Sequence, residues 1–86
     1  MAITTFENVK EIIVKQLNIG DSYVTPDASF IHDLGVDSID AVSLIMAFEE
    51  RFDIDILEEI YDSLHTVQDV VHYIDSENGP LLKHER

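Results

Sequence analysis

Residues 33–56 read DLGVDSIDAVSLIMAFEERFDIDI, and this stretch decides the fold because its apolar residues recur at helical spacing. Turning by about 100° per residue, as an α-helix does, brings five of them onto one contiguous arc: Ala41, Leu44, Ile45, Phe48 and Phe52. A helix from about Ser38 to Phe52 is therefore predicted, with that arc packed against the core.

A second apolar strip lies on another side of the same predicted helix. It consists of Ile39, Val42 and Met46. Glu49 separates this strip from the core arc on one flank, and Ser43 and Glu50 border it on the other. A helix that is apolar on two faces is either buried on both or offers one face to another molecule. Because burying both is hard in 86 residues, we favour a partner-facing strip rimmed with acid; packing by the preceding loop is the alternative.

Two further helices have recognisable starts. Thr4 and Glu7 fit a capping box, and the helix that follows should end near Asn18-Ile19-Gly20, where Gly20 can adopt the left-handed conformation. The last helix should begin at Thr66, whose hydroxyl can cap it together with Asp69 three positions on. The apolar stripes are Phe6, Val9, Ile13 and Leu17 in the first helix and Val67, Val70, Val71 and Ile74 in the last.

Residues 18–36 sustain neither a helical nor an alternating period. A connection of this length is uncommon and is usually functional. Its apolar residues are expected to pin it across the helices: Val24, Phe30, Ile31 and Leu34. With a short helix expected at 58–63 and no strand pattern long enough for a sheet, the predicted fold class is all-α. It is a small four-helix bundle, with three principal helices, one short helix and a long loop between helices 1 and 2.

Length and composition predict one helical domain over residues 1–78. The tail, 79–86, begins with Gly79-Pro80, which ends a helix, so we expect it to be disordered. No apolar run approaches the roughly 18–20 residues that cross a bilayer, and the N-terminus resembles neither a signal nor a transit peptide. The absence of cysteine excludes disulfides, thiolate metal sites and cysteine catalysis. These features favour a cytoplasmic monomer, or an organellar protein after processing.

The charge of the chain is strongly acidic, with a formal net value of −13 at pH 7. Between residues 16 and 82 there are fifteen acids and a single base, Arg51. Such a field repels nucleic acid and anionic lipid, since both are bound through a surplus of Lys and Arg. It attracts basic surfaces on other proteins instead, although acidity can also serve solubility alone.

Catalytic and metal-binding patterns are not recognisable. The four histidines have no i, i+3 or i+4 pairing of the kind that binds zinc. The acidic stretch does not fit a calcium loop, because Gly is not at loop position 6 and Leu44 stands where a bidentate Glu belongs. Gly35 is three residues before Ser38, which does not match a hydrolase elbow. We therefore expect neither an enzyme nor a dedicated metal site.

Ser38 has two readings from the residues alone. Either Asp37 or Ser38 caps the helix by accepting a backbone N–H bond, or Ser38 is a point of covalent attachment. The start of a helix favours an anionic group, and a long loop would deliver the serine to the surface. Asp37 and Asp40 would oppose an anion, so local electrostatics leave both readings open.

The segment over residues 33–56 closely resembles the acyl carrier protein family, whose attachment motif is Asp-Ser-Leu within D-L-G-x-D-S-L. The resemblance extends from about Phe6 to Ile74 and includes four further features: the Phe30-x-x-Asp33-Leu34-Gly35 lead-in, the Met46-Ala47-x-Glu49-Glu50 helix centre, Phe52-Asp53-Ile54, and the closing Thr66-Val67-x-Asp69 helix. It implies a carrier and not a catalyst, with 4′-phosphopantetheine moved from coenzyme A onto Ser38 by a phosphopantetheinyl transferase.

The resemblance also implies what surrounds that arm. Acyl groups would be held as thioesters and presented to acyl-transferring and chain-elongating enzymes, which dock through basic patches. The implied docking residues are Asp37, Ile39, Asp40, Val42, Met46, Glu49 and Glu50, and the candidates for an acyl pocket are Phe48, Ile56, Leu64 and Val70.

Four departures from the family pattern leave the pathway open: Ile39 in place of Leu, Ser43 in place of Glu, Leu57 in place of Pro, and Tyr61 in place of a small residue. Fatty-acid synthesis, a specialised or aminoacyl carrier, and an acidic interaction module without the arm are the alternatives.

Overall fold

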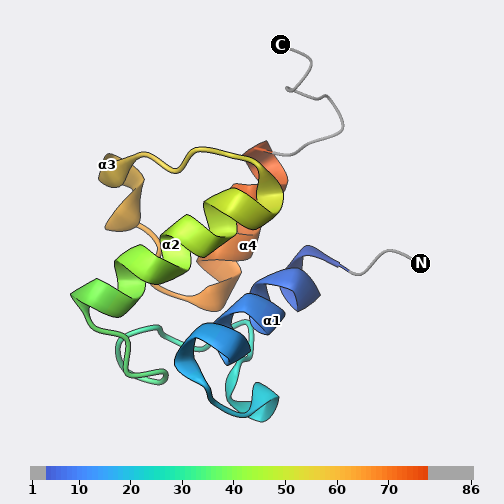
Figure 1. The fold of residues 1–86 in the computed structure, drawn as a ribbon, viewed down its shortest axis with the longest axis vertical. Helices are drawn as coiled ribbons and strands as arrows, with labels where there is room; N and C mark the ends of the chain where they lie inside the picture. The colour runs from blue at the N-terminus through green and yellow to red at the C-terminus, as the bar shows by residue number, and fades with distance from the viewer. Residues whose placement is uncertain (1–3, 78–86) are drawn as a thin grey trace.

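A computed structural model describes residues 4–77, and within them every regular element is helical. The elements are α1 (Thr5–Leu17), the short 3₁₀ helix η1 (Asp21–Tyr23), α2 (Ser38–Phe52), α3 (Glu58–Tyr61) and α4 (Val67–Glu77). Three principal helices and one short one therefore form a small bundle, with the long loop between α1 and α2, as predicted (Figure 1). The predicted disordered tail lies outside the described residues.

The helix starts follow local side-chain chemistry. Thr4 accepts a hydrogen bond from the backbone N–H of Glu7 at 3.1 Å, which satisfies one of the unpaired donors at the start of α1. At α4 the capping is reciprocal. The Thr66 hydroxyl accepts from the N–H of Asp69, and the Asp69 carboxylate accepts from the N–H of Thr66. Both predicted caps are confirmed.

The end of α1 corrects one prediction. Asn18, and not Gly20, adopts the left-handed conformation, with φ of 56°. Asn tolerates this region better than most residues because its short side chain bonds locally. Gly20 has an ordinary φ of −71° and precedes η1. The short helix α3 likewise ends at Tyr61, before the predicted residue 63.

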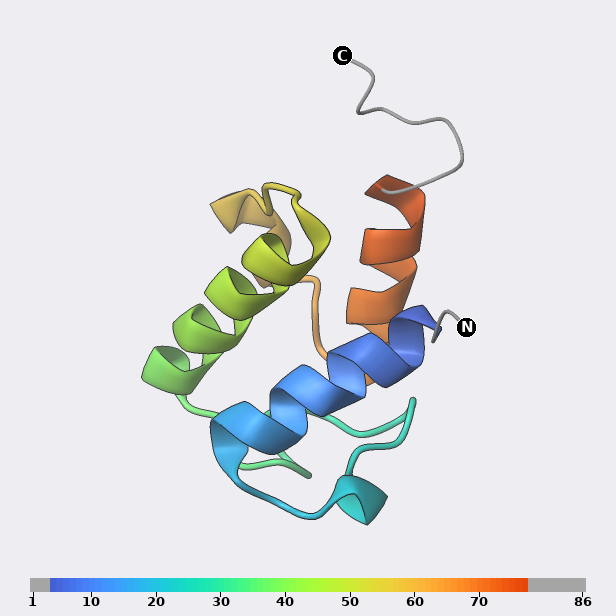
Figure 2. The ribbon, with the colours of Figure 1, turned by 45° about the vertical axis from the view of Figure 1, so that its right-hand side comes forward.

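The core lies where the three long helices meet, and α1 packs against both α2 and α4 (Figure 2). The α2 arc contributes Leu44, Ile45 and Phe48 as buried residues, with Ala41 and Phe52 half-buried. All four apolar residues predicted for α4 are buried as well: Val67, Val70, Val71 and Ile74. Burying each such side chain contributes about 1.5–3 kcal/mol, so the patterns that predicted the helices also supply the core.

The long loop is held against the start of α4 by backbone hydrogen bonds. Phe30 donates to the carbonyl of His65, and the N–H groups of Val67 and Gln68 donate to the carbonyls of Ala28 and Pro26. These bonds include an isolated bridge between Ser29 and Thr66. They also satisfy donors that the first turn of a helix otherwise leaves unpaired. The loop thus becomes a fixed wall of the bundle.

Two of the four loop residues expected to pin the loop are buried, Val24 and Phe30, and Leu34 is half-buried. The expectation is wrong for Ile31, which is 67% exposed. Val36 and Ala28 are buried in its place. The turn that carries Ile31 closes on itself, with Asp33 and Leu34 both donating to the Ser29 carbonyl, so the side chain between them projects outward.

Candidate functional site

Ser38 is the first residue of α2, and its side chain is exposed. The helix is capped by its neighbour, because Asp37 Oδ1 accepts from the N–H of Asp40 at 3.0 Å. Among the described residues, no hydrogen bond involves the Ser38 hydroxyl. The capping side chain and the free hydroxyl therefore belong to two different residues, Asp37 and Ser38. The sequence could not separate these roles, since either side chain could have capped the helix.

The turn before Ser38 fixes where the serine emerges. Val36 donates to the Phe30 carbonyl at 2.8 Å, and the carboxylate of Asp33 accepts from the N–H of Ser29 at 2.7 Å. Gly35 has a φ of +67°, a conformation that side chains rarely adopt. An added Cβ there would meet nothing within 4 Å, so the backbone angle and not space makes glycine suitable.

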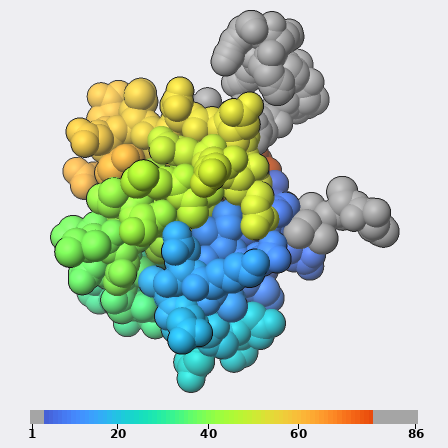
Figure 3. All heavy atoms as spheres, in the orientation of Figure 1, coloured from blue at the N-terminus to red at the C-terminus, as the bar shows by residue number. Residues whose placement is uncertain are grey.

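The second apolar strip of α2 is open to solvent. Ile39 is 77% exposed, Val42 47% and Met46 60%. The loop does not cover it, which leaves the partner-facing interpretation. Figure 3 shows the α2 surface, in green to yellow, across the face of the molecule that also carries α1. An exposed apolar strip of this kind on a small domain is typical of an interaction surface.

The acids predicted to rim this strip differ in what they contact. Asp37 and Glu50 are exposed, and Asp40 is half-buried. Glu49 is half-buried and already engaged, because its carboxylate accepts from the N–H of Ile56 at 2.8 Å. That bond braces the turn between α2 and α3. The basic residue Arg51, near these acids on α2, points to α1. Its guanidinium lies 3.2 Å from the Glu11 carboxylate and donates to the Asn8 side-chain oxygen at 2.7 Å.

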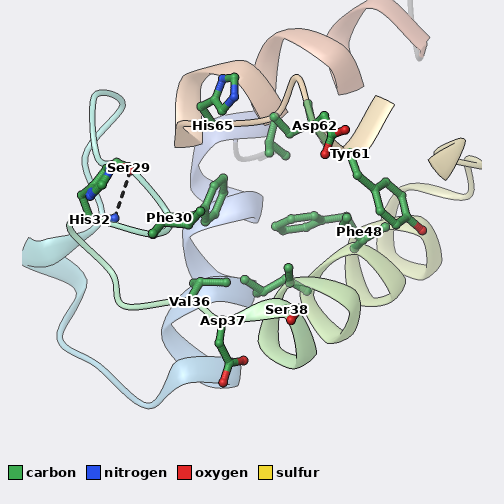
Figure 4. A pocket seen from close by; sticks show the side chains of 16 residues that line it. Ser29, Phe30, His32, Val36, Asp37, Ser38, Phe48, Tyr61, Asp62 and His65 are labelled. Carbon is green, nitrogen blue, oxygen red and sulfur yellow. Dashed lines mark hydrogen bonds between the residues drawn. The ribbon is translucent and has the colours of Figure 1, made fainter. Parts of the chain in front are cut away.

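A cavity of about 780 Å³ opens beside Ser38, between α2, the loop and the segment from α3 to α4. Phe30 and Phe48 face one another across it, and Ser38 lies at its lower edge in Figure 4. Three of the four candidate pocket residues line it: Phe48, Leu64 and Val70. Ile56 is buried in the core but is not among the lining residues.

Sequence reasoning missed several lining residues. Phe30 and Val36 come from the loop, whose path depends on its bonds to α4 and has no periodic signal. Tyr61 comes from α3, and the resemblance indicates only that it is bulkier than the residue usual at its position. Leu44 and Ile45 belong to the predicted core arc, and the cavity adjoins that arc.

Asp69 stabilises the wall of the cavity at the start of α4. Burial raises its pKa, but the hydrogen bonds from the backbone of Thr66 and His65 and from the Thr66 hydroxyl, with the nearby His65 charge, outweigh that effect and lower the pKa below its usual value. The carboxylate accepts from both N–H groups at 3.0 Å. It therefore remains ionised and holds the turn that carries Leu64 and His65.

The family model described as "Phosphopantetheine attachment site" matches residues 7–74. The chain belongs to this family. A carrier domain of this family bears a 4′-phosphopantetheine group, is not itself catalytic, and works with a phosphopantetheinyl transferase and with partner enzymes.

The residues of this carrier domain fit such a group. The exposed hydroxyl of Ser38, which makes no internal hydrogen bond, would hold the phosphate of the group, and the first turn of a helix is a position where unpaired backbone N–H groups favour an anion. Because Asp37 performs the capping, a group attached at Ser38 would not remove the helix cap. No helix of the carrier domain within residues 4–77 is long and apolar enough to span a bilayer.

Proposed function

We propose that the chain is an acyl carrier protein whose 4′-phosphopantetheine is attached to Ser38, and that it delivers acyl groups to enzymes of fatty-acid or related biosynthesis in the cytoplasm. The observation that carries the proposal is the free, exposed hydroxyl of Ser38 beside both an open apolar strip and the mouth of a large cavity. When bound, the arm supplies a thiol that holds acyl groups as thioesters. A chain without cysteine needs such an imported thiol.

The exposed strip is proposed as the docking surface, formed by Ile39, Val42 and Met46 with Asp37, Asp40 and Glu50 at its rim. Acids of this kind steer basic surfaces to the strip and raise the rate of association. The small apolar area limits affinity, which allows rapid release. A protein that visits successive enzymes requires both properties. Glu49, although expected in the same set, has its carboxylate bonded to Ile56, so we assign it mainly to positioning the α2–α3 turn.

The cavity is proposed as the place where the acyl chain is held between visits. Its lining is largely apolar, with Phe30, Phe48, Leu64 and Val70 among the residues that face it. An apolar hollow of about 780 Å³, partly open to solvent and beside the attachment serine, is a feature to explain. Shielding the thioester-linked chain from water accounts for it.

A loading assay separates acyl from aminoacyl cargo. Protein bearing the arm is offered to acyl-activating and aminoacyl-activating ligases in parallel, with Ser38→Ala protein as the blank, and the bound cargo is read by mass spectrometry. We expect acyl loading and no aminoacyl loading on the wild type. Preferential aminoacyl loading would instead favour the specialised carrier.

The third alternative, an acidic module without the arm, needs a different measurement. The affinity of a partner enzyme is compared for arm-bearing wild-type protein and for Ser38→Ala. The carrier proposal expects weaker binding by the variant, since the arm enters the partner. Equal affinities would favour the interaction module.

A further inference from the structure

Ile31 is an exposed apolar residue that lies close to the attachment point but outside α2. Its side chain is 67% exposed, and it lines the mouth of the same cavity as Ser38. The two residues are linked through the backbone, because the Phe30 carbonyl accepts from the N–H of Val36, two residues before Ser38. With consecutive Cα atoms 3.8 Å apart, this bond keeps the Cα atoms of Ile31 and Ser38 within about 15 Å of each other.

The turn that carries Ile31, residues 29–34, is held by hydrogen bonds between its two ends. The N–H of Ser29 donates to the Asp33 carboxylate at 2.7 Å, and the Ser29 hydroxyl accepts from the N–H of His32 at 3.1 Å. The Ser29 carbonyl accepts from the N–H groups of Asp33 and Leu34. The backbone that presents Ile31 is therefore already ordered, so binding through this side chain costs little conformational entropy.

This turn and the exposed strip of α2 lie on different sides of Ser38. In Figure 4 the turn that carries Ser29 and His32 lies to the left of Ser38, and α2 runs to the right of it. A protein–protein interface of standard size takes about 800 Å² from each partner, which is a patch of roughly 16 Å radius. One footprint centred on Ser38 therefore reaches Ile31 as well as Ile39.

An enzyme that acts on the Ser38 hydroxyl itself has to cover both sides. Enzymes that act on cargo at the far end of an arm can dock at a distance from the serine. A phosphopantetheinyl transferase must instead bring its reacting groups to within about 3–3.5 Å of the hydroxyl. The surface that it meets there is acidic, because Asp33 and Asp37 are exposed and no Lys or Arg lies between residues 16 and 50.

We propose that Ile31 is a second apolar contact for the phosphopantetheinyl transferase, which straddles Ser38 and covers the turn 29–34 with a basic surface. This inference rests on the proposed function and adds a contact on the loop to the docking strip on α2. Ile31 contributes to affinity and not to the chemistry, since it touches the partner and not the reacting atoms. Its removal is therefore expected to affect KM and not kcat.

Steady-state kinetics of one phosphopantetheinyl transferase, with the unmodified protein as the varied substrate, tests this contact. Ile31→Ala should raise the KM for the protein about three- to tenfold, as truncation of an apolar interface residue does, and should leave kcat within about twofold. Urea denaturation of the variant and the wild type should give equal midpoints, because an exposed side chain contributes little to stability.

Two charged substitutions test the chemistry of the partner surface. Both Ile31→Lys and Ile31→Glu remove the apolar contact, but only the lysine is repelled by basic groups opposite it. The KM for Ile31→Lys should therefore exceed that for Ile31→Glu several-fold. Tyr23→Ala is the matched control, because Tyr23 is 66% exposed and lies on η1 in the same loop; its KM should equal that of the wild type.

Mass spectrometry first establishes, with Ser38→Ala as the blank, that the wild type is modified at Ser38. A wild type that gains no phosphopantetheine would contradict the proposed function and this inference with it. Three results with a modified wild type overturn this inference alone: an unchanged KM for Ile31→Ala, an equal rise in KM for Tyr23→Ala, or a KM for Ile31→Glu that equals or exceeds that for Ile31→Lys.

Discussion

At the scale of single residues, the neighbours Asp37 and Ser38 divide two roles that the same position could have combined. Asp37 satisfies a backbone donor of the first turn of α2, and Ser38 keeps its hydroxyl free. Stability and modification are therefore expected to depend on different side chains. This separation explains how a helix start can carry a large covalent group without losing its cap.

Substitutions at this pair test the division of roles. Asp37→Ala should lower the free energy of unfolding by about 0.5–2 kcal/mol, the worth of a helix cap. Ser38→Ala should change it by less than about 0.5 kcal/mol, as an exposed residue without internal bonds does. Urea denaturation of the unmodified proteins measures both. Asp37→Asn is the control, since Asn keeps the cap while removing the charge; a loss equal to that of Asp37→Ala would contradict the capping role.

The ionisation of Asp69 predicts a dependence of stability on pH. Its pKa is lower in the folded state than its usual value, so its contribution is present above the unfolded pKa, about 3.9, and is lost as the pH falls through the folded pKa. Asp69→Asn should therefore be less stable at pH 7 and lose less stability between about pH 5 and 2.

The comparison for Asp69 is a series of urea denaturations across that pH range. Asp27→Asn, at an exposed loop residue with no side-chain hydrogen bond among residues 4–77, serves as the control and should follow the wild type. Equal acid dependence for Asp69→Asn and the wild type would show that the bonds to Thr66 and His65 do not set the pKa.

At the scale of elements, α2 is two-sided. Its buried side supplies the core and its exposed side offers Ile39, Val42 and Met46. The helix was predictable from sequence because both its periodicity and its cap are local properties of residues 37–52. The end of α1 and the loop before α2 were less predictable from the sequence. The left-handed end at Asn18 could have formed at Gly20 on local preference alone, and the exposure of Ile31 depends on loop bonds to residues far along the chain.

The candidate site shows the same limit. Ser38 and the exposed strip lie on one predicted helix, so their proximity could be predicted from the sequence. The cavity is assembled from three separate segments, and Phe30 reaches it only because its N–H bonds to His65. No spacing along the chain encodes that contact. The family resemblance made Ile56 a reasonable pocket candidate, but its side chain is buried in the core.

Two substitutions on α2 separate its sides. Phe48 is 1% exposed, so Phe48→Ala should cost about 3–5 kcal/mol of stability. Met46→Ala, two residues away, should change stability by less than about 0.5 kcal/mol but reduce kcat/KM for the transferase several-fold through lost docking contacts. Denaturation and transferase kinetics measure the two effects.

Tyr23, 66% exposed on η1, provides the matched control for an exposed apolar side chain away from α2. Tyr23→Ala should leave kcat/KM for the transferase unchanged. A similar loss of kcat/KM in Tyr23→Ala and Met46→Ala would indicate a general effect of surface apolarity and would argue against a specific docking strip.

At the scale of the whole molecule, charge repulsion opposes folding. The chain carries 18 acidic residues against five basic ones, and among residues 4–77 one ion pair joins two helices, Arg51 with Glu11. Surface pairs of this kind contribute at most about 1 kcal/mol. The acidity that is proposed to steer partners is therefore expected to lower stability at low ionic strength.

Added NaCl or Mg²⁺ should accordingly raise the melting temperature, because salt screens repulsion between exposed carboxylates. Calorimetry across a salt titration at pH 7 measures the effect, and Mg²⁺ should act at lower concentration than Na⁺ at equal chloride. A melting temperature that stays level or falls would mean that self-repulsion is not a significant cost to this fold.

The attachment of the arm to Ser38 is tested most directly by the intact mass of the protein after incubation with coenzyme A and a phosphopantetheinyl transferase. The wild type and Ser43→Ala, which loses the other exposed serine of α2, should each gain the mass of one phosphopantetheine, and Ser38→Ala should gain nothing. An unchanged mass of the wild type with several such transferases, or the same gain in Ser38→Ala, would contradict it.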